Sequence, residues 1–211
     1  MALQIFLLDV WGMISALFVG ALIYHFGGAF AFEYLVLMFI FLVAGTLVTI
    51  IGKEKKEEMG LYEYGRSWQN VVANGLVPVL SLIAGSPAAY FGALSAITAD
   101  KFSSEIGSLG GDPIFLGDFK KVRRGTSGAV SALGTVAGMI GAEIIAVSAY
   151  LLFPGVRLRE ALLLPFVGVA GNFVDSFAGV LETRGLGTKQ TSNILGALAG
   201  ALLAWLLFLL I

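Results

Sequence analysis

Seven long apolar stretches follow one another along the chain, and they restrict its fold more than any other feature. A helix needs roughly 20 mostly apolar residues to cross the hydrocarbon core of a membrane. A water-soluble protein of 211 residues could not bury so much apolar surface, since 58% of its residues are hydrophobic. We therefore predict an all-α polytopic membrane protein with about seven transmembrane helices. The predicted spans are Ala2–Phe26, Phe30–Ile51, Trp68–Ala84, Pro87–Ser104, Ser127–Phe153, Leu158–Glu182 and Gln190–Ile211.

The chain is predicted to form a single domain over residues 1–211, with two long polar loops between its helices. These loops are Gly52–Arg66 and Glu105–Thr126. The first apolar stretch lacks the basic n-region and the small-residue cleavage site of a signal peptide. We therefore expect it to be retained as a helix.

Lysine and arginine residues are distributed unevenly over the predicted loops. Cytoplasmic loops of membrane proteins are enriched in these residues. Eleven of the thirteen cations fall on the side that the N-terminus shares with the two long loops, and only Arg157 and Arg159 fall on the other side. We therefore predict a multi-pass protein of the cell membrane, with its N-terminus in the cytoplasm and its C-terminus outside.

The composition excludes several other classes of function. The formal net charge is −1, so we expect no nucleic-acid partner. The chain has no cysteine, which excludes disulfides, thiolate metal ligands and cysteine nucleophiles. His25 is the only histidine and could not form a zinc site alone. The composition leaves open whether the chain forms a homo-oligomer.

Polar side chains gather at the cytoplasmic ends of several predicted helices. Arg66, Asn70 and Asn74 are four residues apart and therefore share one face of their helix. Asp100 and Ser104 have the same spacing at the end of the next helix. Hydrogen bonds between helices, or a solvated helix end, would also account for such residues. An ionisable residue inside a membrane is costly, however, and each is therefore a functional candidate.

Asp175 is the strongest of these candidates, because it lies two turns inside the sixth predicted helix. An unpaired aspartate at this depth is hard to explain structurally. Asn172 shares its helix face, and Asn193 is expected at a similar depth in the last helix. Together with Asp100 and Glu105, Asp175 provides three carboxylates near one membrane depth.

The second polar loop ends in FKKVRRGTSGAVS, in which four cations precede a glycine-rich turn. We expect the following helix to begin at Ser127, and a turn that leads into a helix presents free backbone N–H groups to an anion. The neighbouring cations would add charge-assisted hydrogen bonds to phosphate. Contact with anionic lipid headgroups is the alternative explanation for these cations. Small residues further along the chain, such as Gly138, Gly196 and Gly200, are expected mainly to allow close helix packing.

A layer of carboxylates, cations and a glycine turn suits a complex of a metal ion with phosphate. Mg²⁺ prefers one or two carboxylates together with phosphate oxygens. Phosphoryl transfer then needs chiefly alignment and charge neutralisation. The cytosol would supply a nucleoside triphosphate and the membrane a lipid acceptor, which indicates a lipid kinase.

Four ordered motifs, YGRSWQNVVANG, ITADKFSSEIGSLG, FKKVRRGTSGAVSALGTVAG and GNFVDSFAGVLE, resemble the integral-membrane phytyl-phosphate kinase family. This isoprenoid-phosphate kinase family is distantly akin to dolichol and phytol kinases. The resemblance covers the whole chain. It implies transfer of the terminal phosphate of CTP, or of another nucleoside triphosphate, to a prenyl monophosphate such as phytyl or geranylgeranyl phosphate. Two departures, Phe102 near the position of an expected tryptophan and the basic pair Arg123–Arg124, leave the substrate preference open.

By this resemblance and the reasoning above, we expect the carboxylates to hold Mg²⁺ and the basic loop to bind nucleotide phosphates. Arg66 and the asparagines would orient the acceptor phosphate. The predicted catalytic residues are Asp100, Glu105, Asp175 and Arg66, and the first three are also the predicted metal ligands. The other predicted binding residues are Lys120, Lys121, Arg124, Gly125, Thr126, Ser127, Gly128, Asn70, Asn74, Ser104, Asn172 and Asn193.

Three other functions are compatible with the same residues. A prenyl-alcohol kinase would need a carboxylate to act as a base on the hydroxyl, whereas a prenyl monophosphate is already an anionic nucleophile. A cytidylyltransferase that makes a CDP-lipid would use the same nucleotide but release pyrophosphate. A small transporter would be expected to place its site near the midplane, with polar residues continuing toward both faces. In this chain, few polar residues fall in the part of the helices that is predicted to lie in the outer half of the membrane.

Overall fold

The computed structural model describes residues 6–210, which form mainly helices. Residues 1–5 and 211, which include the ends of the first and last predicted spans, lie outside the described part. The elements are α1 Val10–Phe26, η1 Gly28–Phe30, α2 Ala31–Ile50, α3 Lys53–Glu58, α4 Trp68–Ile83, α5 Pro87–Gly107, β1 Ile114–Phe115, β2 Ala129–Val130, α6 Ala132–Leu152, α7 Leu158–Glu182 and α8 Lys189–Leu210.

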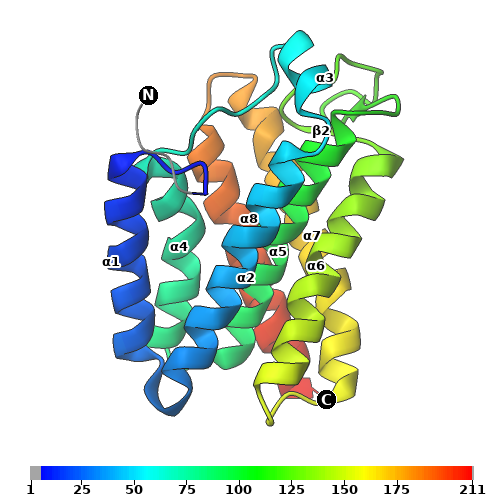
Figure 1. Cartoon of the computed structure of the whole chain (residues 1–211). Helices are drawn as coiled ribbons and strands as arrows, with labels where there is room; N and C mark the ends of the chain where they lie inside the picture. The colour runs from blue at the N-terminus through cyan, green and yellow to red at the C-terminus, as the bar shows by residue number, and fades with distance from the viewer. Residues whose placement is uncertain (1–5, 211) are drawn as a thin grey trace.

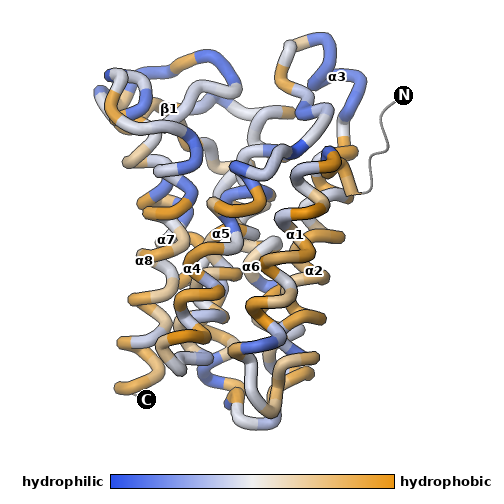
Figure 2. The backbone as a smooth tube through the Cα atoms, turned by 90° about the vertical axis from the view of Figure 1, so that its left-hand side faces the viewer, coloured by the Kyte–Doolittle hydropathy of each residue, from blue (hydrophilic) through white to orange (hydrophobic). Residues whose placement is uncertain are grey.

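The long helices form a bundle in which successive helices run in opposite directions (Figure 1). α5 lies at the centre and packs against α2, α4, α6, α7 and α8. The short helix α3 and the hairpin of β1 and β2 cover one end of the bundle, and the C-terminus lies at the other end (Figure 1). Figure 2 shows that hydrophilic residues concentrate at the covered end, while apolar residues predominate along the helices. This covered end is called the polar end below.

Four of the described helical segments are long and apolar enough to cross a membrane: Gly28–Ile50, α6, α7 and α8. α1 and α4 are also apolar but have only 17 and 16 residues. α5 has 21 residues and is buried continuously from Tyr90 to Ala99, so other helices surround this part of it. The chain is therefore a multi-pass membrane protein, and the count of seven spans stays a prediction.

Side-chain caps explain where several helices begin. The Asp9 carboxylate accepts a hydrogen bond from the backbone N–H of Gly12 at 2.6 Å, and α1 accordingly begins at Val10 rather than near Ala2. Ser86 caps α5 in the same way, with Pro87 in the first turn, where a missing backbone N–H costs nothing.

The expected helix start at Ser127 is wrong. Gly125 and Gly128 adopt positive φ angles of 80° and 78°, which are incompatible with a right-handed helix. β2 then pairs with β1, and α6 begins only at Ala132, capped by the Ser131 hydroxyl. The prediction of an all-α chain therefore missed one small antiparallel hairpin inside the second polar loop.

The expected close packing at small residues is confirmed. A Cβ at Gly200 would lie 2.5 Å from the carbonyl oxygen of Gly92, so α5 and α8 approach at this point more closely than side chains allow. A Cβ at Gly138 would lie 3.0 Å from the Ala99 carbonyl oxygen, on the other side of α5. These contacts hold α6 and α8 against the central helix and thereby fix the positions of its polar side chains.

Candidate functional site

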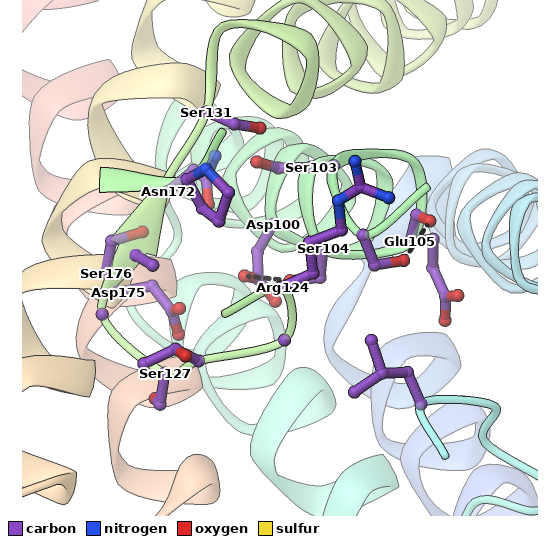
Figure 3. A pocket seen from close by; sticks show the side chains of 18 of the residues that line it. Asp100, Ser103, Ser104, Glu105, Arg124, Ser127, Ser131, Asn172, Asp175 and Ser176 are labelled. Carbon is purple, nitrogen blue, oxygen red and sulfur yellow. Dashed lines mark hydrogen bonds between the residues drawn. The ribbon is translucent and has the colours of Figure 1, made fainter. Parts of the chain in front are cut away.

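A polar cavity of about 340 Å³ lies at the polar end of the bundle (Figure 3). Its walls come from the last two turns of α5, the middle and end of α7, the first residue of α8 and the turn that precedes β2. Serine, asparagine and carboxylate side chains dominate this lining. They include Asp100, Ser103, Ser104, Ser131, Asn172, Asp175, Ser176 and Glu182, and Lys189 adds a cation.

Asp100 on α5 and Asp175 on α7 face one another across the cavity. The ammonium nitrogen of Lys189, at the start of α8, lies 3.8 Å from a carboxylate oxygen of each. The Ser104 hydroxyl donates to the same Asp100 oxygen, Oδ1, at 3.4 Å. Asp175 is only 5% exposed, so its charge depends on these neighbours for compensation. Two carboxylates from separate helices thus share one lysine at a distance beyond a direct hydrogen bond.

Asn193 lies behind this pair, one turn into α8. In one orientation its amide donates a hydrogen bond to Asn74 Oδ1 at 3.4 Å. With the amide turned over, its nitrogen donates to Asp175 Oδ1 at 3.2 Å and to the Lys189 carbonyl oxygen at 2.9 Å, which satisfies more partners. Asn193 can therefore bond either to Asn74 of α4 or to the Asp175 carboxylate, depending on the orientation of its amide.

Glu182 fixes the glycine turn against the end of α7. The Ser127 hydroxyl donates to one Glu182 oxygen at 2.8 Å, and the Ser192 hydroxyl donates to the other. A Cβ at Gly179 would lie 2.6 Å from the backbone nitrogen of Gly128, so the turn touches the helix backbone. The turn is therefore held as a rigid wall of the cavity.

Glu105 belongs to a different group of charges, although one edge of it lines the cavity. Its oxygens lie 2.6 Å from the ammonium of Lys56 and 2.7 Å from that of Lys101, and they accept a hydrogen bond from the Thr49 hydroxyl. Among residues 6–210, no three His, Cys, Asp or Glu side chains come together as a metal-binding group. The expected set of three carboxylates is thus not assembled, because Glu105 is engaged by two lysines.

Arg66 extends this second group toward α2. Its guanidinium donates to the carbonyl oxygen of Gly45 at 2.7 Å and to the Thr49 hydroxyl at 2.8 Å, and its Nε lies 3.5 Å from a Glu63 oxygen. Glu63 also lies 2.6 Å from Lys101. Lys56, Arg66 and Glu105 are buried, whereas the Lys101 and Glu63 side chains stay 20% and 35% exposed. We call it the basic cluster; its members are Lys56, Glu63, Arg66, Lys101 and Glu105.

The two groups have opposite charge excess. The basic cluster contains three cations and two carboxylates, which leaves one positive charge. Glu63 and Glu105 line the cavity as well but are counted with the basic cluster; the other charged residues of the cavity are three carboxylates and two cations, which leaves one negative charge. These cavity residues are Asp100, Asp175, Glu182, Arg124 and Lys189.

The hairpin lysines lie outside the cavity lining. Lys121 forms an ion pair with Asp112 at 2.7 Å, and Lys120 with Asp118 at 3.2 Å, all on the exposed surface. The hydrogen bond from Lys121 lowers the pKa of Asp112, and the backbone N–H of Lys120 lowers the pKa of Asp118. Of the predicted basic residues in this loop, only Arg124 lines the cavity.

The expected anion site at a helix N-terminus is wrong for the same loop. β2 separates the turn Gly125–Gly128 from the start of α6, so the turn does not lead directly into a helix. All four residues of the turn nevertheless line the cavity. The turn is positioned by Glu182 and Gly179 instead of by a helix.

The chain matches the family described as Integral membrane protein DUF92 over residues 1–201. It belongs to this family. A membrane protein of Methanocaldococcus jannaschii, described as uncharacterized, is 35% identical over 209 residues, which cover 95% of this chain and 86% of that protein. Protein PGR of Arabidopsis thaliana is 26% identical over 82% of this chain and 70% of its own length. No solved structure matches the chain.

The structure distributes the predicted site residues over four places. Arg66, Asn70 and Asn74 line an apolar groove on the far side of the basic cluster, and Lys120 and Lys121 lie on the hairpin surface. Asn193 lies behind the cavity wall, beside Asp175. The cavity itself is lined by Asp100, Ser104, Glu105, Arg124, Gly125, Thr126, Ser127, Gly128, Asn172 and Asp175.

Sequence reasoning missed several residues that the structure brings to these sites. Lys189 has a signal in the sequence, because it begins the helix that also contains Asn193. Glu63 and Lys56 have none, since they belong to a polar loop whose folding onto α2 and α5 depends on tertiary contacts. Ser103, Ser131, Ser176 and Glu182 also line the cavity, although they were not among the predicted site residues; helical spacing puts Ser103 near Asp100 and Ser176 near Asp175.

Proposed function

We propose that this protein is a kinase that transfers the terminal phosphate of CTP, or of another nucleoside triphosphate, to a prenyl monophosphate. The observation that supports this proposal best is the pairing of Asp100 and Asp175 in a polar cavity beside a buried cluster of excess positive charge. The cavity, which has an excess of negative charge, suits a metal–nucleotide complex, and the basic cluster suits a second phosphate. The four motifs that resemble phytyl-phosphate kinases include Asp100 and Asp175 of the cavity, and Arg66, Lys101 and Glu105 of the basic cluster.

Asp100 and Asp175 fit a magnesium site better than the expected set of three carboxylates. Mg²⁺ usually takes one or two protein carboxylates and completes its shell with water and phosphate oxygens. When bound, the ion would neutralise charge on the transferred phosphoryl group. Lys189 holds both carboxylates near one point, and Asn193 orients Asp175 by a hydrogen bond.

The remaining cavity residues suit the nucleotide phosphates. Arg124 would donate hydrogen bonds to phosphate oxygens. The hydroxyls of Thr126 and Ser127 already donate to the Arg123 carbonyl oxygen and to Glu182, so these two residues would shape the wall beside the phosphates. In the transfer, an oxygen of the prenyl monophosphate forms a bond to the terminal phosphorus of CTP. The bond between that phosphorus and its bridging oxygen breaks, and CDP leaves with the electron pair. The nucleophile is already an anion, so the chain needs no general base.

The proposal includes an orientation in the membrane. The seven long helices would all cross the bilayer, with the N-terminus and the polar end in the cytoplasm and the C-terminus outside. The concentration of lysine and arginine at the polar end supports this orientation. It would expose the cavity to cytosolic nucleotide and keep the helices in contact with lipid.

A labelled-nucleotide assay tests the proposal directly. Purified protein in detergent would be given Mg²⁺, CTP labelled in its terminal phosphate, and either geranylgeranyl phosphate or geranylgeraniol. We expect labelled geranylgeranyl diphosphate from the first acceptor, CDP as the coproduct, and no product after chelation of Mg²⁺. Label transfer only to the alcohol would indicate a prenyl-alcohol kinase. Release of pyrophosphate would indicate a cytidylyltransferase, and no transfer from any nucleotide would exclude a kinase.

A further inference from the structure

An apolar groove of about 190 Å³ lies between α1, α2 and α4. α1 packs on both of the other helices, while α2 and α4 make few contacts with one another, so the three helices leave a space. Its walls are almost wholly aliphatic and aromatic. They include Leu8, Ala16, Val19, Gly20, Leu35, Met38, Phe39, Phe41, Leu42, Val71 and Gly75.

Polar residues occur in this groove only where it meets the basic cluster. They are Arg66, Asn70 and Asn74. Arg66 Nε is the only buried side-chain nitrogen or oxygen in residues 6–210 that lacks a hydrogen-bond partner, although it forms an ion pair with a Glu63 oxygen at 3.5 Å. An acceptor that approaches Nε more closely than Glu63 does would therefore be stabilised here. With the positive excess of the cluster, this end of the groove suits one anionic group.

We propose that the groove binds the isoprenoid chain of the acceptor and that Arg66, Asn70 and Asn74 hold its phosphate. This inference rests on the proposed function for the identity of the acceptor. An apolar channel that ends at a buried positive charge has the complementary shape and charge for an amphiphile with an anionic head. The groove belongs to α1, α2 and α4, so the lipid would occupy a different side of the bundle from the nucleotide.

The phosphate end of the groove also lies next to the paired carboxylates. Asn74 lines the groove and, on its other side, a narrow gap that also contacts Asp100, Asp175 and Asn193. For the transfer, the phosphate would have to pass Asn74 into this gap, where its oxygen could reach the terminal phosphorus of a nucleotide held beside Asp100 and Asp175. The two substrates would thus approach the gap from opposite sides.

The groove is short, and its length predicts which part of the lipid is recognised. Along α2 its lining extends from Leu35 to Leu42, which corresponds to about 10 Å of helix. A long isoprenoid chain would be enclosed only near its phosphate, and the rest would extend into the membrane. We therefore expect selectivity for the isoprene units next to the phosphate and tolerance of total chain length.

Photolabelling can test the groove without any catalysis. A geranylgeranyl phosphate analogue with a diazirine on its first isoprene unit would be irradiated with the full-length protein in nanodiscs, without nucleotide. We expect labelled peptides from α1, α2 and α4, including Val19, Phe39 or Val71. Labels confined to α5, α6 or the outer faces of the bundle would overturn the inference.

A matched pair of variants sharpens the test. Gly20→Leu places a side chain in the groove, because a Cβ at Gly20 would have only Leu35 nearby, at 3.6 Å. Gly155→Leu makes the same change in the α6–α7 turn, where a Cβ would meet nothing within 4 Å. We expect Gly20→Leu to reduce labelling about tenfold, in line with a steric change in a hydrophobic pocket, and Gly155→Leu to leave it unchanged. Equal labelling of both variants would contradict the proposal.

Competition identifies the occupant and separates this inference from the proposed function. In detergent micelles without phospholipid, unlabelled prenyl phosphates of shorter and longer chains should displace the label equally well, and an added two-chain phospholipid should not. Displacement by the phospholipid, or a sharp preference for one chain length, would overturn the inference. Groove labelling without kinase activity would reject the proposed function alone. Kinase activity that Gly20→Leu does not affect would reject the groove alone.

Discussion

The cavity and the basic cluster are built from the same helix end but have opposite properties. Asp100 and Lys101 are consecutive residues of α5, and the helical rotation of 100° per residue turns them toward different neighbours. Asp100 faces Asp175 and Lys189, whereas Lys101 faces Glu63 and Glu105. The cavity leaves its carboxylates incompletely paired, while the cluster pairs both of its carboxylates at close range. This difference suggests that the first region binds ligands and that much of the second holds the fold together.

The largest expected effect is on catalysis, and it comes from the cavity. Asp175→Asn or Asp100→Asn should lower the rate of phosphate transfer by at least about a hundredfold, comparable to the loss of one group that stabilises transition-state charge. Turnover of the purified variants with labelled CTP would measure this. Asp112→Asn, the same change on the exposed hairpin, is the control and should be as active as the parent. Normal turnover of Asp175→Asn would remove that residue from the site.

Glu105→Gln should affect stability more than chemistry. It leaves Lys56 and Lys101 without their shared carboxylate, and breaking a buried ion pair in this way costs about 3–5 kcal/mol. Unfolding in a denaturing detergent, followed by circular dichroism, would show the loss. Asp118→Asn, whose carboxylate is exposed, should unfold like the parent. A stable Glu105→Gln protein that has lost Mg²⁺-dependent turnover would restore the expected metal role of Glu105.

Arg66→Lys tests the end of the basic cluster that borders the apolar groove. The lysine keeps the charge but loses the paired hydrogen bonds of the guanidinium to Gly45 and Thr49. We expect KM for the prenyl phosphate to rise about tenfold, with KM for CTP unchanged, because the interaction concerns binding of only one substrate. Steady-state kinetics with each substrate varied in turn would measure both constants. Equal increases in the two constants would contradict the separation of the two substrates.

The smallest expected effect concerns the basic loop. Arg124→Ala should raise KM for CTP several-fold, about the contribution of one charge-assisted hydrogen bond at a partly exposed position. Lys121→Ala removes a cation of the same loop that is paired with Asp112 outside the cavity, and it should leave this KM unchanged. A larger effect from Lys121→Ala would mean that the hairpin closes over the nucleotide when it binds.

Local signals in the sequence were sufficient for most of the helices. Apolar length predicted α2, α7 and α8 to within a few residues at both ends, and it also predicted the end of α6. The predicted start of α6 was wrong, because two glycines with positive φ and the pairing of β1 with β2 precede the helix, which begins only at Ala132. A serine or glycine in a polar loop has no local pattern that distinguishes a helix start from a hairpin. The start of α6 therefore depended on the pairing of β2 with β1.

Helical periodicity also placed Asp100 with Ser104, and Asp175 with Asn172, on shared faces. It could not decide which faces meet, because that depends on how helices rotate and cross when they pack. The grouping of Glu105 with Lys56, instead of with Asp175, was decided by the return of α3 onto α2 and α5. The same packing brought Lys189 between the two aspartates.

The sequence by itself determined that this chain lies in a membrane as a helical bundle with its charged residues at one end. The reason is that hydrocarbon length and the cost of burying charge act on each segment separately. Only the tertiary structure divided those charges into an acidic cavity and a basic cluster beside an apolar groove. Coulombic pairing acts over a few ångströms between side chains that are far apart in the sequence, so the partners are defined only after the helices have packed.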